Sequence, residues 1–207
     1  LCISEEDVKR KISKKTKCII PVHFGGMPCN LNSIQNIARK NNLTIIEDAA
    51  HATGTTYKNK KIGSHGTAVC FSFHPVKNLA MPTGGLISIN HKNHKQFRKT
   101  LLARRWCGIT DRVDSKYDVK ELGWNYYMNE ISAAVGLAQL ERLKEIVNKR
   151  KQSANLFNQA VGDCKFLEVQ KIPSGYVHSH YTFCVKYKSQ NIIGFTWKDF
   201  YNKYIEM

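Results

Sequence analysis

Apolar runs alternate with amphipathic stretches along most of the chain, and this order predicts an α/β fold. Short runs of branched and aromatic residues, each bounded by glycine or polar residues, are typical of buried strands. Runs of this kind predict strands at residues 18–24, 43–47, 68–73 and 86–89. Apolar positions at helical spacing predict helices at residues 31–38, at residues 92–105 and from Asn129 to about Val147.

Individual residues indicate where the predicted helices begin and where the first strand lies in the sheet. Asn30 can cap the first helix, whose apolar residues fall on one face, namely Leu31, Ile34, Ile37 and Ala38. Asn129 followed by Glu130 provides a cap and an acid in the first turn of the long helix. Pro21 lies inside the first predicted strand. Because proline donates no ladder hydrogen bond, we expect this strand not to be central in the sheet.

A second domain is expected to begin after the long helix. Residues 161–175 break the pattern and indicate a boundary. Beyond them Tyr181, Phe183 and Val185 alternate with less apolar neighbours, which predicts a half-buried strand. We therefore expect a partial large domain at residues 1–160 and the start of a smaller domain at residues 161–207.

The composition narrows the class of protein. The 207 residues are 42% hydrophobic, the mean hydropathy is −0.41, and no apolar run approaches the ~20 residues of a membrane-spanning helix, which argues against a membrane protein. The seven cysteines form no Cys-x-x-Cys pair and no cluster with histidine at metal spacing, so reduced thiols in the cytosol are expected instead of a zinc site or a disulfide framework. The chain starts at Leu1 without methionine or signal peptide, and we expect it to be a fragment.

The net charge of +16 raises the question of nucleic-acid binding. The basic residues occur in short groups along the whole chain, and acidic residues interrupt several of these groups. This distribution favours a solvated surface over a nucleic-acid footprint. A second interpretation is an electrostatic field that attracts an anionic substrate such as a nucleotide diphosphate.

Two polar motifs follow predicted strands directly. Asp48 ends one apolar run, and Lys77 follows another. In open α/β sheets, ligands bind outside the carboxyl ends of strands. An amine and a carboxylate are the groups that pyridoxal phosphate requires, since the amine binds the cofactor as a Schiff base and the carboxylate keeps the pyridine nitrogen protonated. Taken singly, Asp48 also suits a helix cap and Lys77 a surface position.

The chain carries several ordered motifs, namely Ile19-Ile20-Pro21-Val22-His23-Phe24-Gly25-Gly26, Glu47-Asp48-Ala49-Ala50-His51-Ala52, Gly63-Ser64, Phe71-Ser72-Phe73-His74-Pro75-Val76-Lys77-Asn78 and Gly123-Trp124-Asn125-Tyr126-Tyr127-Met128-Asn129-Glu130. Over most of residues 1–160, these motifs resemble those of the DegT/DnrJ/EryC1/StrS sugar aminotransferases. The resemblance implies the fold-type I architecture of pyridoxal-phosphate-dependent aminotransferases, a mostly parallel sheet with helices on both faces. It also implies a cytosolic homodimer.

The resemblance further implies roles for single residues. Lys77 matches the lysine that binds the cofactor and then moves a proton between the substrate carbon and the cofactor carbon. Asp48 matches the partner of the pyridinium nitrogen, and His51 matches a residue placed beside the cofactor ring. Ser72 matches a phosphate ligand, and Asn125 matches an asparagine that reaches the phosphate in the neighbouring subunit.

Some features depart from the family pattern. Pro82 and Thr83 replace Gly-Glu before the double glycine, Tyr127 replaces an arginine and Cys107 replaces a histidine, which leaves the sugar-binding details open. His180 lies where relatives touch the substrate, but a structural or surface histidine also fits there. In relatives, a glycine-rich loop before the region matched here holds the cofactor phosphate. We expect residues 1–207 to lack that loop and therefore to be a poor catalyst on their own.

The resemblance predicts an enzyme that moves an amino group, from glutamate, to a keto group of a nucleotide-linked deoxysugar. The setting would be the biosynthesis of surface polysaccharide, glycan or secondary-metabolite sugars, with neither nucleic acid nor membrane as partner. One alternative is a relative that dehydrates the sugar, which Lys77 disfavours because such relatives carry histidine there. Another is a non-catalytic binding protein, which would need to retain neither Asp48 nor Lys77.

Overall fold

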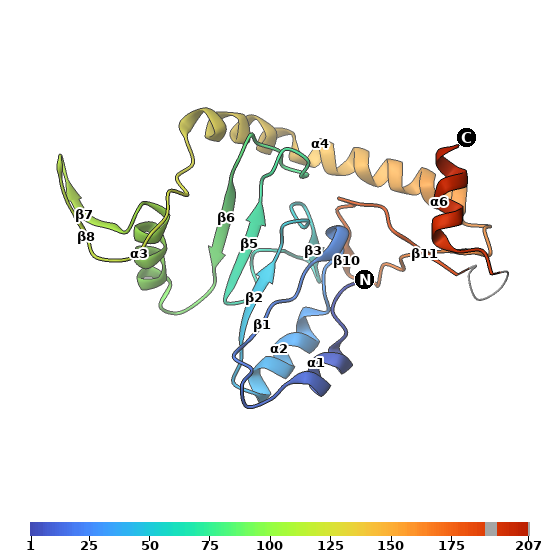
Figure 1. Cartoon of the computed structure of the whole chain (residues 1–207), viewed down its shortest axis with the longest axis horizontal. Coiled ribbons are helices and arrows are strands. Elements are labelled where there is room, and N and C mark those ends of the chain that lie inside the picture. The colour runs from blue at the N-terminus through green and yellow to red at the C-terminus, as the bar shows by residue number, and fades with distance from the viewer. Residues whose placement is uncertain (189–193, 207) are drawn as a thin grey trace.

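The computed structural model describes residues 1–188 and 194–206 and is built on a central four-stranded sheet (Figure 1). The strands are β1 (Cys18–Ile19), β2 (Thr44–Asp48), β5 (Ala68–Ser72) and β6 (Gly85–Ile89), in the order β1-β2-β5-β6. β1, β2 and β5 run parallel, whereas β6 is antiparallel to β5. The predicted α/β class with a mostly parallel sheet is therefore confirmed.

The helices differ greatly in length. They are α1 (Glu5–Lys11), α2 (Leu31–Lys40), α3 (His94–Arg105), α4 (Glu130–Val161) and α6 (Trp197–Ile205), and a short 3-10 turn, η1, spans Phe24–Gly26. α1 and α2 lie together at one end of the strands, and α4 runs past the opposite end towards α6 (Figure 1). Beyond β6 lie α3 and a hairpin of β7 (Ile109–Val113) and β8 (Lys116–Val119). In the described part of the chain, no helix is both long and apolar enough to cross a membrane.

Two smaller sheets involve the residues after α4. β10 (Tyr176–Val177) pairs with β3 (Thr56–Tyr57), which also pairs with β4 (Lys60–Lys61). β9 (Leu167–Val169) pairs with β11 (Val185–Tyr187). Through β10, the chain returns from α4 to the first part of the fold before it continues to α6 (Figure 1). The division into domains at residue 160 stays a prediction.

The core lies between α2 and the sheet. The four apolar residues predicted to share one face of α2 are all buried, namely Leu31, Ile34, Ile37 and Ala38. They belong to one cluster with Ile19, Ile45 and Val69 from the strands. Asn30 accepts a hydrogen bond from the Ser33 amide and caps α2, as predicted. Each buried aliphatic side chain contributes about 1.5–3 kcal/mol, so this face holds α2 and the parallel strands as one unit.

The first predicted strand is shorter than its apolar run. β1 ends at Ile19, and pairing resumes only at a single bridge between Val22 and Asp48. Pro21 interrupts the ladder because it has no N–H, although its carbonyl accepts the Asp48 amide hydrogen at 3.0 Å. β1 lies at the edge of the sheet, as the proline predicted. The chain beyond it still runs beside the end of β2, since the His23 amide donates to the Asp48 carbonyl at 3.0 Å.

The strand predicted around Tyr181 is wrong in position. The observed strand is β11, which begins only at Val185, and Tyr181 lies in a bent segment before it. His180 has a φ of +49°, which turns the chain, and the Thr182 amide donates to the Gly25 carbonyl at 3.1 Å. These features direct the segment towards the glycine turn after β1, so its backbone does not join a ladder.

A buried histidine–carboxylate pair joins β2 to the turn after β1. Glu47 and His23 are fully buried, and His23 Nε2 lies 2.9 Å from one Glu47 carboxylate oxygen. His23 Nδ1 accepts the Cys29 amide hydrogen at 3.1 Å, so Nε2 carries the proton that is donated to Glu47. The second Glu47 oxygen accepts the Gly66 amide hydrogen. This network fixes the residue that precedes Asp48.

Replacing Glu47 with leucine is expected to lower the free energy of unfolding of the full-length protein by about 3–5 kcal/mol, because the buried His23 ring and the Gly66 amide would lose their partner. Urea unfolding measures this change. Glu141→Leu, at an exposed position of α4, is the matched control and should change stability by less than about 0.5 kcal/mol. Equal effects of the two substitutions would contradict the structural role of the pair.

Candidate active site

Of the residues predicted to form a site, Asp48, Ser72 and Lys77 lie at the carboxyl edge of the sheet. Because β1, β2 and β5 are parallel, their carboxyl ends meet at one edge. Asp48 is the last residue of β2 and Ser72 the last residue of β5, while Asp48 is in register with Cys70. Lys77 follows in the connection from β5 to β6. The edge therefore gathers residues that are distant in sequence.

Asp48 is held by its own backbone at this edge. Its amide and carbonyl bond to the residues beyond β1, and its half-buried side chain forms a local turn. One carboxylate oxygen, Oδ1, accepts the Ala50 amide hydrogen at 3.0 Å. Among the described residues, Oδ2 has no hydrogen-bond partner. The carboxylate therefore keeps an oxygen available for an N–H donor.

Lys77 lies in a tight turn that backbone hydrogen bonds close. Its amide donates to the His74 carbonyl at 2.8 Å, and the Met81 amide donates to the Phe73 carbonyl at 2.8 Å. The Lys77 side chain is half-buried, and its Nζ lies 4.6 Å from the centroid of the Tyr181 ring. The backbone of the turn and an aromatic ring thus confine the amine.

The pKa of His51 depends on both charged residues of the site, Asp48 and Lys77. Burial lowers the pKa of His51, the positive charge of Lys77 lowers it further, and the negative charge of Asp48 acts in the opposite direction. His51 Nδ1 accepts the Gly25 amide hydrogen at 3.3 Å, so the neutral ring carries its proton on Nε2. The structure thus brings three of the predicted site residues, Asp48, His51 and Lys77, into one electrostatic environment.

Tyr181 is a site residue that the sequence reasoning missed. Its ring stacks on His51, with 4.3 Å between the centroids and 22° between the planes. Arg150 of α4 donates to the Tyr181 carbonyl at 3.1 Å, and its guanidinium carbon lies 5.9 Å from the ring centroid. The polar and aromatic run from His178 to Tyr181 is the signal that could have revealed this segment, because such a run is atypical of a strand interior.

A buried polar network anchors the segment that carries Tyr181. The Ser179 hydroxyl lies 2.9 Å from the Thr55 hydroxyl, which lies 2.8 Å from the Gly26 carbonyl. Asn78, the residue after the lysine, donates to the Ser179 carbonyl at 3.4 Å and to the Thr53 carbonyl at 3.1 Å. A Cβ on Gly26 would lie 2.4 Å from the Ser179 hydroxyl oxygen, so only glycine permits this approach.

Two predicted residues lie outside the cluster. Ser72 is half-buried at the end of β5, and its hydroxyl accepts the His74 amide hydrogen at 3.3 Å. Asn125 is exposed and bridges to Trp106, which follows α3. Within a single chain, the structure therefore groups Asn125 with the α3 region of the fold and not with Lys77.

His180 belongs to a histidine pair beside the site. Its ring stacks on that of His178, with 4.0 Å between the centroids, and its amide donates to His178 Nδ1 at 2.8 Å. Burial is the main cause that lowers the pKa of both rings, to about 4 for His178, and the charge of Lys151 lowers that of His180 further. These contacts fit the structural alternative that the sequence left open for His180.

The residues at the sheet edge fit pyridoxal phosphate. The site offers an amine, a carboxylate with an available oxygen and a neutral imidazole, which suit an aldehyde, a ring nitrogen and a flat aromatic ring, respectively. A hollow of about 870 Å³ lies between β6 and α3, but neither Asp48 nor Lys77 lines it. The hollow lacks this set of groups, so the sheet edge is the candidate site for the cofactor.

Known proteins are similar to this chain in both sequence and fold. The DegT/DnrJ/EryC1/StrS aminotransferase family matches residues 1–200. The uncharacterized protein MJ1066 of Methanocaldococcus jannaschii is 35% identical over 162 residues, which are 76% of this chain and 42% of that protein. The structure of Helicobacter pylori PseC, an aminotransferase involved in the biosynthesis of pseudoaminic acid, has a TM-score of 0.88 at 25% identity and covers 99% of this chain and 54% of that one.

A third match is the sugar aminotransferase CalS13 of Micromonospora echinospora, with a TM-score of 0.82, 28% identity and coverage of 92% of this chain and 53% of that one. The chain thus spans about half the length of these relatives. The matches confirm the predicted fold-type I aminotransferase architecture, for which pyridoxal phosphate is the cofactor. The chain belongs to the DegT/DnrJ/EryC1/StrS aminotransferase family.

Proposed function

We propose that the full-length protein is a pyridoxal-phosphate-dependent aminotransferase acting on a nucleotide-linked deoxysugar. The amino group would come from glutamate and go to a keto group of the sugar, in surface-polysaccharide, glycan or secondary-metabolite biosynthesis. The observation that carries this proposal is the placement of Asp48 and Lys77 at the carboxyl edge of parallel strands, where the charges of both residues act on His51. The sugar aminotransferases among the structural relatives support the substrate class.

In this proposal, Lys77 and Asp48 have different roles in the reaction. When bound, pyridoxal phosphate supplies an electron-withdrawing ring that stabilises negative charge on the substrate carbon. Asp48 holds a proton on the ring nitrogen through its available carboxylate oxygen. Lys77 binds the cofactor and, once released, takes a proton at Nζ and returns it to a neighbouring carbon. The half-buried setting keeps that amine close to the reacting atoms.

His51 contributes a neutral ring. Burial and the charge of Lys77 lower its pKa, so at neutral pH it adds no positive charge beside Asp48. With Nδ1 occupied by the Gly25 amide, its remaining polar group is the Nε2–H. A flat ring with one N–H donor suits contact with the cofactor ring and with one of its polar substituents, while Ser72 at the end of β5 would bind the phosphate.

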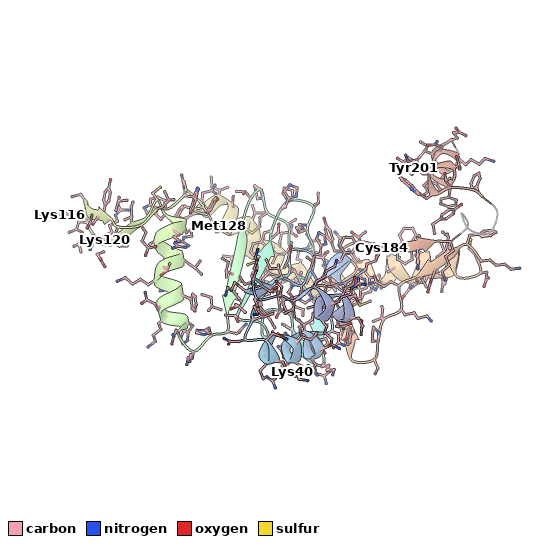
Figure 2. All side chains as sticks on the ribbon, turned by 60° about the horizontal axis from the view of Figure 1, so that its bottom comes forward. Lys40, Lys116, Lys120, Met128, Cys184 and Tyr201 are labelled. Carbon is pink, nitrogen blue, oxygen red and sulfur yellow. The ribbon has the colours of Figure 1, made fainter. Side chains whose placement is uncertain are left out.

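We further propose a homodimer in which Asn125 reaches the cofactor phosphate of the partner subunit. Asn125 is exposed, and exposed aromatic rings flank it, with Trp124 stacked on Tyr126 at 6.1 Å between centroids. The neighbouring hairpin projects from the body, with Lys116 and Lys120 at the opposite end of the molecule from Tyr201 (Figure 2). An exposed apolar patch of this kind suits a protein interface.

The free state of all seven cysteines supports a cytosolic location.

Incubating the full-length protein with glutamate, pyridoxal phosphate and a panel of nucleotide-linked keto-sugars is expected to yield an amino-sugar and 2-oxoglutarate in equal amounts. Mass spectrometry of the sugar and an enzyme-coupled assay of the oxo acid measure the two products. The Lys77→Ala protein is the control and should form neither product. Loss of water from the sugar without consumption of glutamate would favour the dehydrating alternative and contradict the proposal.

A further inference from the structure

The Tyr181 ring contacts both Lys77 and His51. The Lys77 Nζ lies 4.6 Å from the ring centroid, within the distance of about 6 Å at which a cation is attracted to the face of an aromatic ring. The same ring stacks on His51 at 4.3 Å and 22°. A single side chain from the C-terminal half of the chain therefore contacts two residues of the sheet edge.

The backbone around Tyr181 is fixed from several directions. The Ser179 amide donates to the Gly26 carbonyl at 3.1 Å, and the Thr182 amide donates to the Gly25 carbonyl at 3.1 Å. The Tyr181 carbonyl itself accepts a hydrogen bond from Arg150. Because both sides of the residue are tied to the glycine turn, the ring is held beside the lysine by the main chain and does not depend on a mobile loop.

Two positively charged groups lie over the electron-rich face of the Tyr181 ring. Lys77 Nζ and the Arg150 guanidinium both lie within 5.9 Å of the ring centroid. Aromatic rings carry negative potential on their faces, which stabilises a nearby ammonium or guanidinium group. The stacked partner, His51, is neutral because burial and Lys77 lower its pKa, so the ring does not have to offset a third positive charge.

We infer that Tyr181 is a positioning residue that stabilises the ammonium form of Lys77 through the face of its ring and orients His51 by stacking. The inference rests on the proposed function for its purpose, since an ammonium is the form that Lys77 takes while it holds the proton removed from the substrate carbon. The aromatic face provides the stabilisation, whereas the hydroxyl group of Tyr181 is not required for it. This difference makes the inference testable.

The test measures how fast the Lys77 amine reacts in the cofactor-free full-length protein. Reductive methylation with formaldehyde and cyanoborohydride at neutral pH needs the uncharged amine, and peptide mapping reports methylation at position 77 alone. In Tyr181→Leu, which keeps apolar bulk without an aromatic face, Lys77 is expected to react about 2- to 30-fold faster, the factor that a cation–π contact provides. Tyr181→Phe keeps the face and should stay within about twofold of the wild type.

A second series keeps the shape of the ring constant. Phenylalanine at position 181 carrying one, two or three fluorines weakens the negative face stepwise, and the Lys77 rate should rise with each fluorine. Tyr187→Leu, which removes a tyrosine outside the site, is the control and should leave the rate unchanged. None of these measurements requires amino transfer, so they are independent of the proposed function. The inference would be overturned if the methylation rate of Lys77 did not change with the number of fluorines. It would also be overturned if Tyr181→Leu and Tyr181→Phe changed that rate equally.

Discussion

Lys77→Ala is expected to abolish amino transfer by the full-length protein. Alanine removes both the group that binds the cofactor and the group that moves the proton, and the proton transfer alone accounts for about 10²–10⁴-fold in rate. Stability should change little, because the side chain is only half-buried and its amine contacts an aromatic ring without an ion pair among the described residues. Turnover of glutamate with the preferred keto-sugar measures the loss, and urea unfolding measures the stability.

The position of the cofactor provides the direct check on this prediction. Borohydride reduction of the loaded wild-type protein, followed by peptide mapping, should place the cofactor mass on Lys77. Lys58 is a matched control, because its Nζ also lies over a tyrosine ring, that of Tyr57, but it sits beside β3, away from the sheet edge. Lys58→Ala should therefore retain turnover. Recovery of the label on Lys58, Lys60 or Lys61 would remove the assignment of Lys77.

Asp48→Asn is expected to lower kcat by about 10²–10³-fold while leaving stability nearly unchanged. Asparagine has the same shape and can still accept the Ala50 amide hydrogen through its side-chain oxygen, so the local turn survives. It lacks the negative charge that would keep the ring nitrogen of the cofactor protonated. The loss should therefore appear in the chemical step and not in folding.

Steady-state kinetics and urea unfolding of the same preparation separate these two effects. Asp48→Ala is the comparison variant, because it removes the charge and also the acceptor for the Ala50 amide. It should lose activity to a similar degree and lose stability in addition, by about 1 kcal/mol, the usual value of one such hydrogen bond. Near-normal kcat in the asparagine variant would show that Asp48 acts as a turn residue only.

Local patterns predicted the elements whose residues face one buried surface. The α2 face was predictable because Leu31, Ile34 and Ile37 recur at helical spacing, and β2 and β5 because their apolar runs end in polar residues. The same patterns located Asp48 and Lys77, since Asp48 ends β2 and Lys77 lies in the connection that follows β5. An amine and a carboxylate at strand ends suggested pyridoxal phosphate, and the family resemblance then assigned the individual roles of the two residues.

Other features depend on partners that are distant in sequence. Tyr181, Phe183 and Val185 alternate as in a strand, but the Tyr181 segment bonds to Gly25 and Gly26, which no short window of sequence reveals. The direction of β6 relative to β5 was equally unpredictable, because a short apolar run fits either direction. Asn125 lacks a partner within the cluster at the sheet edge, so its proposed role depends on a second subunit.

The anchoring of Tyr181 has a consequence for the order in which the chain folds. The contact of Thr55 with Ser179 spans 124 positions and that of Asn78 with Ser179 spans 101, whereas β5 pairs with β6 as the next strand in sequence. Closing a longer loop costs more entropy, and contacts between distant residues form more slowly. During synthesis, the sheet and the lysine turn are therefore expected to form first. The amine would then stay uncovered until the ribosome has released the residues beyond α4.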